Sequence, residues 1–477
     1  MKENMLVDRE ASTNQVRSED SGQADSFVPV RMIEIELGQP LPTITALDEK
    51  KGSYYRRARC LMRLHTQPLG LVELTIDTDE LSPGEYAPHV WQALSEQINE
   101  HLRQDGLSPV TALTAAGLPN LLTPQCIEER ESFLQTAPFV SIIVSTRDRP
   151  EDLARCLQAL MALHYPRYEV IVVDNAPTTT ATADFIQQAY SDEPRIQYMR
   201  ENHPGSSLAR NCGIMAARGE IFAFTDDDTV VDAYWLAELV KAFSSRDKVA
   251  CVTSLVSPLE LETQAQAWFE EYGGFDKGFT RRIFDRSGSA DIPLYPFTAG
   301  QFGTGAGMAF TAAFLRSEGG FDPALGPGTR AGGGEDLAAF FRVIIGGYQL
   351  VYEPASLLYH LHRRGYAHLQ KQIYHYGSGL TAYLTKIILE NPLLLFNILA
   401  NAPYGLFFIL SSRSPKNRKK SKNYPQELSA LERKGMLYGP LAYVLSRWAL
   451  GRTHKRPVVV EENTHPSATR DGLASPS

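Results

Sequence analysis

Between residues 138 and 228, short apolar runs alternate with amphipathic segments, and this alternation constrains the fold more than any other feature of the chain. The runs FVSIIVST, EVIVVDNA, RIQYMRE and IFAFTDDD are separated by EDLARCLQALMALHYP, TADFIQQAY and SSLARNCGIMAARGE. Continuous apolar strands that alternate with helices are typical of a sheet covered on both faces. We therefore predict an α/β fold with a mostly parallel sheet and helices on both of its faces.

Three of these expected strands end in polar residues. The ends are Ser145 to Arg147, Asp174 with Asn175, and the three consecutive carboxylates Asp226 to Asp228. Open α/β sheets bind their ligands at the carboxyl ends of the strands. These residues therefore mark the expected ligand site.

Three adjacent carboxylates repel one another, so a buried strand that ends in them calls for a positive charge. The alternative is a charged loop that caps the helix expected in DAYWLAELVKAF, but Asp232 alone can cap that helix, which leaves the three carboxylates unexplained. Carboxylate oxygens suit Mg²⁺ or Mn²⁺, and Mg²⁺ is usually shared with substrate phosphates. The pattern favours a divalent metal site and a phosphorylated substrate.

The runs FVSIIVSTRDRP, EVIVVDNA, ARNCGIMAARGEIFAFTDDD and GGGEDLAAFFRV together resemble family 2 glycosyltransferases of the GT-A fold, over roughly residues 138 to 385. The resemblance implies an inverting, metal-dependent transferase of the hexosyltransferase type. Its donor would be a nucleotide-diphosphate sugar, and its acceptor a glycan or lipid-linked hydroxyl, as in the synthesis of cell-envelope polysaccharides. The chain departs from the common pattern at Arg147-Asp148, where Tyr-Asn is frequent.

The resemblance also implies roles for individual residues. Asp227 would face the ribose or the sugar, and Asp174 would accept a hydrogen bond from the base. Three further residues would lie along the nucleotide, namely Ser145, Thr146 and Arg147. Metal binding would fall to Asp226 and Asp228.

Downstream, GGGEDLAAFF places Glu335 and Asp336 at the start of an expected helix. Carboxylates are favoured there by the helix dipole alone, but the glycines before them allow close approach of a substrate. Asp336 is the candidate catalytic base and Glu335 the alternative. In the resembling family a histidine near the position of His360 completes the metal shell, with His362 the second candidate here, although a structural histidine explains either one equally well.

Other downstream residues have weaker assignments. The arginines of the pair Arg363-Arg364 are candidates for contact with the diphosphate, or form a solvated basic pair. Trp268, Phe275 and Phe302 are candidates for the acceptor side, and packing within loops is an equal alternative.

The flanking regions divide the chain further. We expect disordered tails at 1–27 and 457–477, a small α+β unit at 28–134, the catalytic domain at 135–385 and a helical region at 386–456. The unit at 28–134 contains a hairpin around Gln67 to Gly70 and an amphipathic helix near 87–102, with no predicted chemistry.

The C-terminal region has an apolar stretch at 393–410 followed by the basic segment SRSPKNRKKSKNYP. An apolar stretch beside a basic cluster is typical of attachment to an anionic membrane surface. A core helix followed by a solvated loop remains the alternative.

Composition excludes several classes. A net charge of −8 argues against general nucleic-acid binding, and five scattered cysteines without a CxxC pair indicate a reducing compartment and give no zinc signal. The polar N-terminus lacks the apolar core of a signal peptide, so we expect a cytoplasmic protein at the inner face of the membrane.

Two other functions remain open. One is a non-catalytic nucleotide- or sugar-binding module. The other is a phosphatase of the haloacid-dehalogenase type, although that resemblance implies an Asp-x-Asp motif on the first strand of its domain.

Overall fold

A computed structural model of the chain describes residues 27–118, 122–288, 292 and 294–453. The expected disordered tails lie outside the described residues, apart from Phe27. The large domain is built on a nine-stranded sheet with the order β10-β9-β8-β11-β15-β13-β16-β12, and β14 pairs with β16. Its strands are β8 (Val140–Thr146), β9 (Tyr168–Asn175), β10 (Ile196–Glu201), β11 (Ile221–Asp226), β12 (Thr229–Val231), β13 (Val249–Pro258), β14 (Arg282–Phe284), β15 (Gly307–Thr311) and β16 (Gln349–His360).

The four strands expected from the sequence form the parallel half of this sheet. β10, β9, β8 and β11 are consecutive neighbours and all run parallel, whereas β15 pairs antiparallel with both β11 and β13. The predicted α/β fold is confirmed. The antiparallel strands lie downstream, where the sequence shows no regular alternation of strands and helices.

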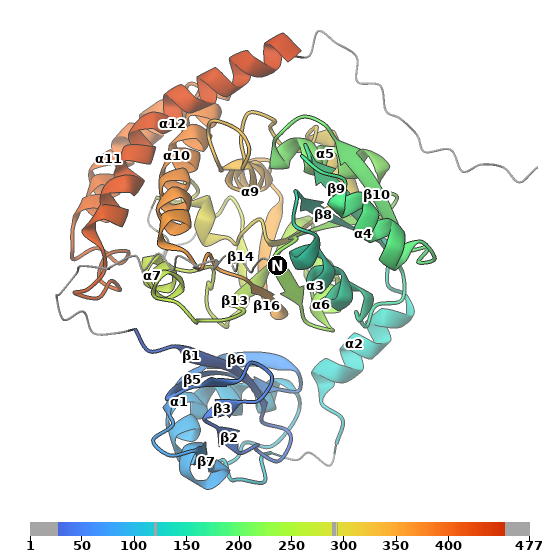
Figure 1. The fold of residues 1–477 in the computed structure, drawn as a ribbon, viewed down its shortest axis with the longest axis vertical. Coiled ribbons are helices and arrows are strands. Elements are labelled where there is room, and N and C mark those ends of the chain that lie inside the picture. Colours follow the sequence, from blue (N-terminus) through green and yellow to red (C-terminus); the bar gives the residue numbers. More distant parts are fainter. Residues whose placement is uncertain (1–26, 119–121, 289–291, 293, 454–477) are drawn as a thin grey trace, which may run out of the picture.

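Helices cover both faces of the sheet (Figure 1). One face packs on α3 (Pro150–Met161), α4 (Ala181–Tyr190) and α6 (Trp235–Lys241), and the other on α5 (Ser206–Ala216), α8 (Ala312–Ser317) and α9 (Glu335–Ile345). Successive residues of a strand point to opposite faces. Accordingly Ile142 and Val144 belong to the first core, and Ile143 to the second.

The sheet curls so that β12, last in the strand order, returns beside β11. The hydroxyls of Thr225 and Thr229 lie 2.7 Å apart. Only Asp227 and Asp228 connect the two strands. The acidic residues therefore close the curl of the sheet.

The N-terminal unit has its own core and lies below the large domain in Figure 1. A sheet in the order β1 (Val30–Glu36), β5 (Arg57–Leu64) and β6 (Gln67–Thr75) packs on the long helix α1 (Pro83–Gln104). Two small sheets flank it, formed by β2 (Ile44–Thr45) with β7 (Glu80–Leu81) and by β3 (Leu47–Asp48) with β4 (Ser53–Tyr54). A single helix, α2 (Gln125–Gln135), leads from this unit to β8.

The predicted hairpin exists, but its turn was placed wrongly. The turn is His65-Thr66, both with positive φ (54° and 71°), and the residues from Gln67 onward belong to β6. Gly70 serves a different purpose, because a Cβ there would lie 2.6 Å from Cδ2 of Leu94 on α1. The glycine allows the helix to approach the strand closely.

The two units are joined by backbone and side-chain contacts. The N–H of Val30 donates to the carbonyl of Leu261 at 2.9 Å. Arg63 on β5 forms an ion pair with Asp232, just after β12, at 2.8 Å. The N-terminal unit therefore contacts the large domain four residues after Asp228, the end of the Asp227-Asp228 connection between β11 and β12 (the acidic connection).

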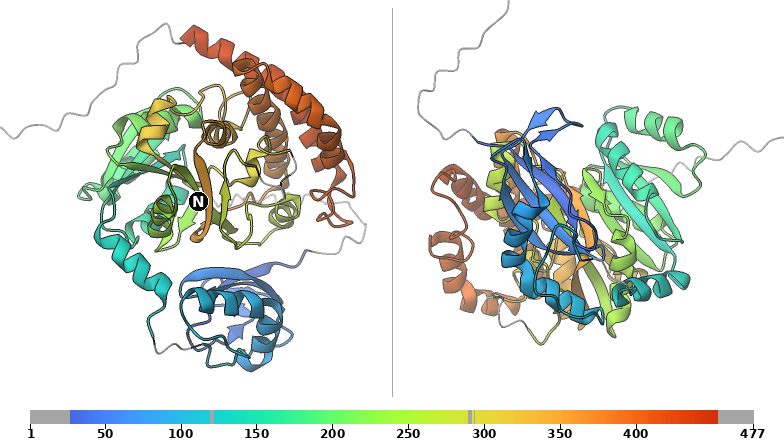
Figure 2. Two further views of the ribbon diagram at one scale, coloured as in Figure 1. Left: turned by 180° about the vertical axis from the view of Figure 1, so that it is seen from behind. Right: turned by 90° about the horizontal axis from the view of Figure 1, so that it is seen from below.

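Three helices complete the chain: α10 (Tyr366–Glu390), α11 (Leu394–Leu410) and α12 (Gln426–Thr453). They lie along one side of the large domain (Figure 2). Glycines let α10 and α12 pack in close contact, since a Cβ on Gly435 would lie 2.0 Å from the carbonyl oxygen of Tyr374. The boundary expected at residue 385 falls inside α10. No helix among the described residues is long and apolar enough to cross a membrane.

Candidate active site

The strand ends singled out in the sequence lie side by side at one edge of the sheet. Asp226 on β11 is paired in register with Ser145 on β8, and Thr146 with Asp174 on β9. The parallel arrangement of these strands places all of their carboxyl ends at this edge.

Arginines neutralise the acidic residues. Arg149, at the start of α3, lies 3.3 Å from a carboxylate oxygen of Asp227 and 3.3 Å from one of Asp228. Arg363 reaches Asp228 at 3.4 Å. Arg210 on α5 reaches Asp226 at 3.3 Å.

The carboxylates differ in their proton affinity. Burial and the negative charge of Asp228 raise the pKa of Asp227 to about 7. Thr146 donates its hydroxyl hydrogen to Asp227 at 2.8 Å. Burial also opposes ionisation of Asp228, but the charges of His360, Arg363 and Arg149 outweigh it and lower the pKa of Asp228.

His360 reaches this site through strand pairing. β12 runs antiparallel to β16 with Thr229 opposite His360, and Nε2 of His360 lies 3.2 Å from Asp228. Asp226, Asp228 and His360 each offer one ligand atom, and these three atoms lie within 4.8 Å of one another. The residue set predicted for the metal is therefore brought together.

The side chains of His362 and Arg364, which follow His360, point away from the three carboxylates. Nε2 of His362 lies 3.0 Å from Glu270, and Arg364 pairs with Glu260. Neither residue contacts the acidic connection, so Arg363 is the arginine of this pair that faces it.

Glu335 and Asp336 begin α9 as expected. Gly334, before them, has a φ of 91°, and a Cβ there would lie 2.4 Å from the carbonyl oxygen of Gly379. Asp336 accepts hydrogen bonds from the N–H groups of Gly305 at 3.0 Å and Leu337 at 2.8 Å. Burial raises the pKa of Asp336, against the opposing charge of Arg210.

Arg210 links the two halves of the site. It pairs with Glu335 at 2.7 Å as well as with Asp226, and Ser206 donates to the same oxygen of Glu335 at 3.2 Å. Burial raises the pKa of Glu335 as well. Because Glu335 is engaged by Arg210 and Ser206, Asp336 is the carboxylate of this pair that the arginine leaves available.

The residues proposed for the nucleotide have mixed surroundings. Asp174 is fully buried, accepts a hydrogen bond from Tyr198 at 3.1 Å, and has one oxygen without a partner among the described residues. Burial raises its pKa. Arg147 is exposed and lies 3.8 Å from the carboxylate of Asp148.

The three acceptor-side aromatics separate in the structure. Phe302 has no exposed surface and packs against Phe284 and Tyr295 in the core, which agrees with the alternative of packing. Phe275 packs on the ring of His360, with centroids 4.9 Å apart. Trp268 is partly exposed on α7 (Gln264–Tyr272).

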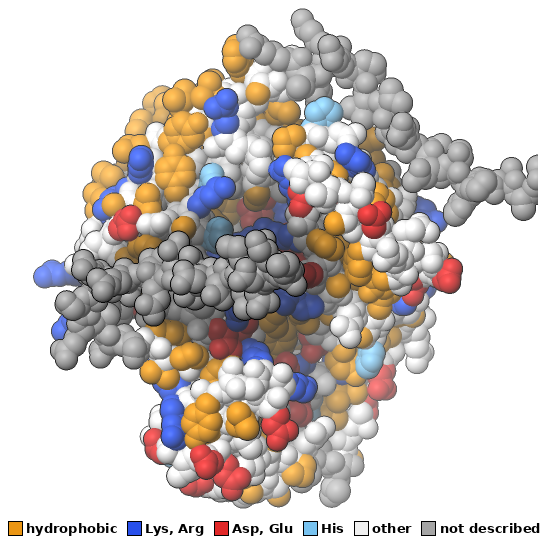
Figure 3. All heavy atoms as spheres, in the orientation of Figure 1, with side chains coloured by type: hydrophobic (Ala, Val, Ile, Leu, Met, Phe, Trp, Pro, Cys, Tyr) orange, Lys and Arg blue, Asp and Glu red, His pale blue; other side chains and the backbone are white. Residues whose placement is uncertain are grey.

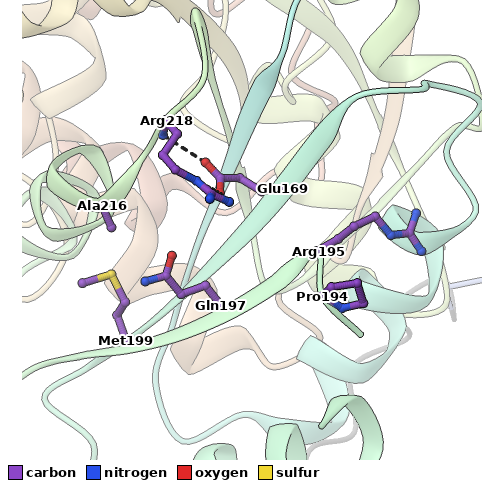
Figure 4. Close-up of a pocket in the computed structure, with 7 residues that line it drawn as sticks. All are labelled: Glu169, Pro194, Arg195, Gln197, Met199, Ala216 and Arg218. Carbon is purple, nitrogen blue, oxygen red and sulfur yellow. Dashed lines mark hydrogen bonds and ion pairs between the residues drawn. The ribbon is translucent and has the colours of Figure 1, made fainter. Parts of the chain in front are cut away.

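A cavity of about 490 Å³ lies elsewhere, at the edge strand β10 (Figure 4). Arg218 and Glu169, two of the residues that line it, form an ion pair. None of the predicted site residues lines it.

Comparison with known proteins finds glycosyltransferases. Residues 141–301 match the family model described as "Glycosyl transferase family 2". The pre-mycofactocin glycosyltransferase of Mycobacterium tuberculosis is 26% identical over 47% of this chain and 43% of its own length. Glycosyltransferase AglE of Haloferax volcanii is 35% identical over 23% of this chain and 36% of its own.

The chain thus spans less than half the length of these curated relatives. Among solved structures, the mannosyltransferase PcManGT from Pyrobaculum calidifontis, in complex with GDP-Man and Mn²⁺, aligns over 70% of this chain and 85% of its own. Its sequence identity is 17% and the TM-score is 0.39. Over residues 141–301, within the large α/β domain, the chain is therefore similar to family 2 glycosyltransferases.

Proposed function

We propose that this protein is a metal-dependent, inverting glycosyltransferase that moves a hexosyl group from a nucleotide-diphosphate donor to a hydroxyl of a glycan or lipid-linked acceptor. The observation that carries the proposal is the convergence of Asp226, Asp228 and His360 at the sheet edge, with Arg210 joining Asp226 to the start of α9. The candidate metal ligands for a leaving diphosphate and the candidate base for the acceptor, Asp336, would then lie in one site.

The residues present fit a divalent cation. Two carboxylates and one imidazole are suitable ligands for Mn²⁺, and also for Mg²⁺ with the imidazole less usual. Nε2 of His360 faces Asp228, and Nδ1 is buried without a hydrogen-bond partner among the described residues. When bound, the ion supplies Lewis-acid stabilisation of negative charge on the departing diphosphate.

The arginines support the same assignment. Arg149 and Arg363 both contact Asp228, at 3.3 and 3.4 Å. Both guanidiniums therefore lie beside the residues that would hold the cation, and they would suit the oxygens of a diphosphate, which arginine binds well. Thr146 holds the carboxylate of Asp227 through its hydroxyl, which fixes the orientation of Asp227 toward the sugar or ribose.

The nucleotide would lie along Ser145, Thr146 and Arg147. The unpartnered oxygen of Asp174 is the acceptor available to an N–H of the base. Its raised pKa is consistent with a buried carboxylate that waits for a hydrogen-bond donor.

The acceptor hydroxyl needs a base as the new bond forms. Asp336 is held by two backbone N–H groups, and its raised pKa makes it a stronger base than an exposed aspartate. Attack on the face opposite the leaving diphosphate inverts the anomeric carbon. Arg210, between Asp226 and Glu335, keeps the base and the donor side at a fixed separation.

Attachment to a membrane surface is part of the proposal. None of the residues of α11 is buried, and hydrophobic side chains gather over α11 and α12 in Figure 3. The exposed ones include Phe396, Leu399 and Trp448. An apolar face beside exposed basic side chains favours the anionic inner surface of a membrane, which would keep the protein cytoplasmic and peripheral.

A thermal-stability screen tests the catalytic proposal. The full chain is heated with a panel of nucleotide-diphosphate hexoses, with Mn²⁺, with Mg²⁺ or with a chelator. A donor at 100 times its Kd should stabilise the fold by about 2.7 kcal/mol, and only with a metal present. If no donor stabilises the protein under any condition, the proposal is wrong. If a donor stabilises the protein but its sugar is not transferred or hydrolysed when acceptors are added, the chain is a binding module.

A further inference from the structure

Four residues far apart in the sequence meet inside the N-terminal unit. His65 lies in the β5–β6 turn, His101 and Asp105 lie at the end of α1, and Cys126 lies at the start of α2. Each offers one ligand atom, and the four atoms lie within 4.8 Å of one another. The four residues are between 6% and 8% exposed.

The side chains of these four residues contact one another directly. Nδ1 of His65 lies 3.0 Å from Nε2 of His101, which is 3.1 Å from Oδ2 of Asp105. Nδ1 of His65 also contacts Oδ2 of Asp105 directly. Sγ of Cys126 lies 3.3 Å from the same oxygen.

Protons alone do not satisfy this arrangement. A ring nitrogen either donates one hydrogen or accepts one, in a single direction. In the triangle of His65, His101 and the carboxylate of Asp105, every placement of hydrogens on the two rings leaves two donors or two acceptors facing each other along one side. A cation at the centre meets all of the lone pairs at once.

The ligand set selects the metal. Two imidazoles, a thiolate and a carboxylate are ligands of Zn²⁺, which prefers four of them in a tetrahedron at 2.0–2.3 Å. Such a tetrahedron separates its ligand atoms by roughly 3.3–3.7 Å. The His65–His101 and His101–Asp105 contacts, at 3.0 and 3.1 Å, would open by a few tenths of an ångström, and the closer contact of His65 with Asp105 would open further. The oxygen-rich set at Asp226 and Asp228 has the opposite preference.

The backbone supports the same assignment. His101 and Asp105 are one helical turn apart and therefore share a face of α1. His65 and Thr66 both have positive φ, a strained conformation for non-glycine residues that places His65 against this face. The N–H of Cys126 donates to the second oxygen of Asp105 at 3.0 Å, which orients the carboxylate.

We propose that His65, His101, Asp105 and Cys126 form a structural zinc site. All four ligands come from this chain and the group is buried, as in sites that stabilise a fold without reacting. The site ties three elements together: the hairpin turn, α1 and α2. Since α2 leads into β8 and its Arg130 pairs with Glu238 on α6 at 3.3 Å, the zinc also fixes the helix that connects the two units.

Metal analysis of the full chain tests this. Protein expressed with zinc in the medium and purified without chelator should contain about one zinc per chain by elemental mass spectrometry. His101→Ala and Cys126→Ser should reduce this to a small fraction. Matched controls are His89→Ala, at an exposed position on the same helix, and Cys212→Ser, outside the cluster; both should retain the zinc, as should Asp228→Ala.

A second measurement does not depend on how the variants fold. Wild-type protein loaded with Co²⁺ in place of zinc should show thiolate-to-cobalt absorption in the near ultraviolet and the visible bands of a tetrahedral ion. Octahedral cobalt without a thiolate band, a wild-type protein that neither contains nor takes up zinc, or a His101→Ala variant that keeps its zinc would each overturn the proposal.

Discussion

The three adjacent carboxylates each meet different partners. Asp226 faces Arg210, Asp227 faces Thr146 and Arg149, and Asp228 faces His360 and Arg363 in addition to Arg149. The residue with the most cations around it has a lowered pKa, and its neighbour has a raised one. Identical side chains in sequence are therefore chemically distinct in the fold.

This difference predicts a pH effect of Asp227→Asn. A carboxyl group whose pKa is raised to about 7 in the fold binds its proton more tightly there than in the unfolded chain. Its contribution to stability is complete at low pH and is lost as the pH rises toward 7. Without metal, Asp227→Asn should therefore gain in melting temperature relative to wild type between pH 4 and 7, with no further gain above. The exposed Asp192→Asn is the control, and a pH-independent difference would contradict the assignment.

Metal binding predicts unequal effects of its ligands. Asp228→Ala should abolish metal-dependent donor binding, because Asp228 contacts His360 and is the most buried of the three candidate ligands. His360→Ala should weaken binding less or shift the preference between Mn²⁺ and Mg²⁺. Calorimetry with Mn²⁺ measures both. His362→Ala, which removes a contact to Glu270 instead, should lower stability but leave this affinity unchanged.

The base assignment predicts a chemical defect in Asp336→Asn. The substitution keeps the shape of the side chain but removes the proton acceptor, so turnover should fall by roughly 10²–10⁴. Donor and metal affinity should stay close to wild type, since Asp336 is not among the metal-side residues. A product that retains the anomeric configuration of the donor, or turnover near wild type, would reject the role.

The positions of individual candidate residues were predictable where they end a strand or begin a helix. Ser145, Asp174 and Asp226 follow apolar runs whose parallel arrangement fixes their common edge. Arg149 and Arg210 were not predicted, because their role depends on how α3 and α5 lie over the sheet. The cluster of His65, His101, Asp105 and Cys126 was also missed, since only His101 and Asp105 lie one helical turn apart and the other two ligands are distant in sequence.

At the scale of whole elements, periodicity succeeded and turn signals misled. The strands β8, β9, β10 and β11 lie where the apolar runs predicted them. The Gln67–Gly70 segment resembles a turn, but its glycine makes room for Leu94, and Pro68 lies beside an irregularity in the β5–β6 pairing. Proline and glycine have tertiary roles that local sequence does not distinguish.

The apolar helix and the basic segment after it predict binding to vesicles. Arg413, Arg418, Lys419 and Lys422 are exposed. Replacing these four residues with Gln should weaken co-sedimentation with anionic vesicles, and high salt should do the same. Equal binding to neutral and anionic vesicles would contradict an electrostatic contribution.

Lys416 is left out of this variant because its ammonium pairs with the buried Glu432, so its loss would test stability instead. Phe396→Ser with Leu399→Ser removes the apolar contribution and should weaken binding to both kinds of vesicle.

At the scale of the whole molecule, the N-terminal unit depends on Arg63. Its guanidinium is largely buried and pairs with both Glu34 and Asp232. Arg63→Ala leaves Asp232 without this cation, and breaking a buried pair costs about 3–5 kcal/mol. We expect calorimetry to show a separate, lower transition for the N-terminal unit. Arg57 lies on the same strand as Arg63 and forms an exposed pair with Glu73 of β6, so Arg57→Ala should cost about 1 kcal/mol or less.

The two-residue connection between β11 and β12 has a consequence for the energetics of ligand binding. Asp227 and Asp228 are fixed at both ends by strands and across by the contact between Thr225 and Thr229. Ordering a residue costs roughly 1–2 kcal/mol of conformational entropy. Folding has already ordered this segment, so a ligand that binds there does not have to. Because the curl of the sheet orders this segment during folding, a ligand that binds there avoids this entropic cost and binds more tightly.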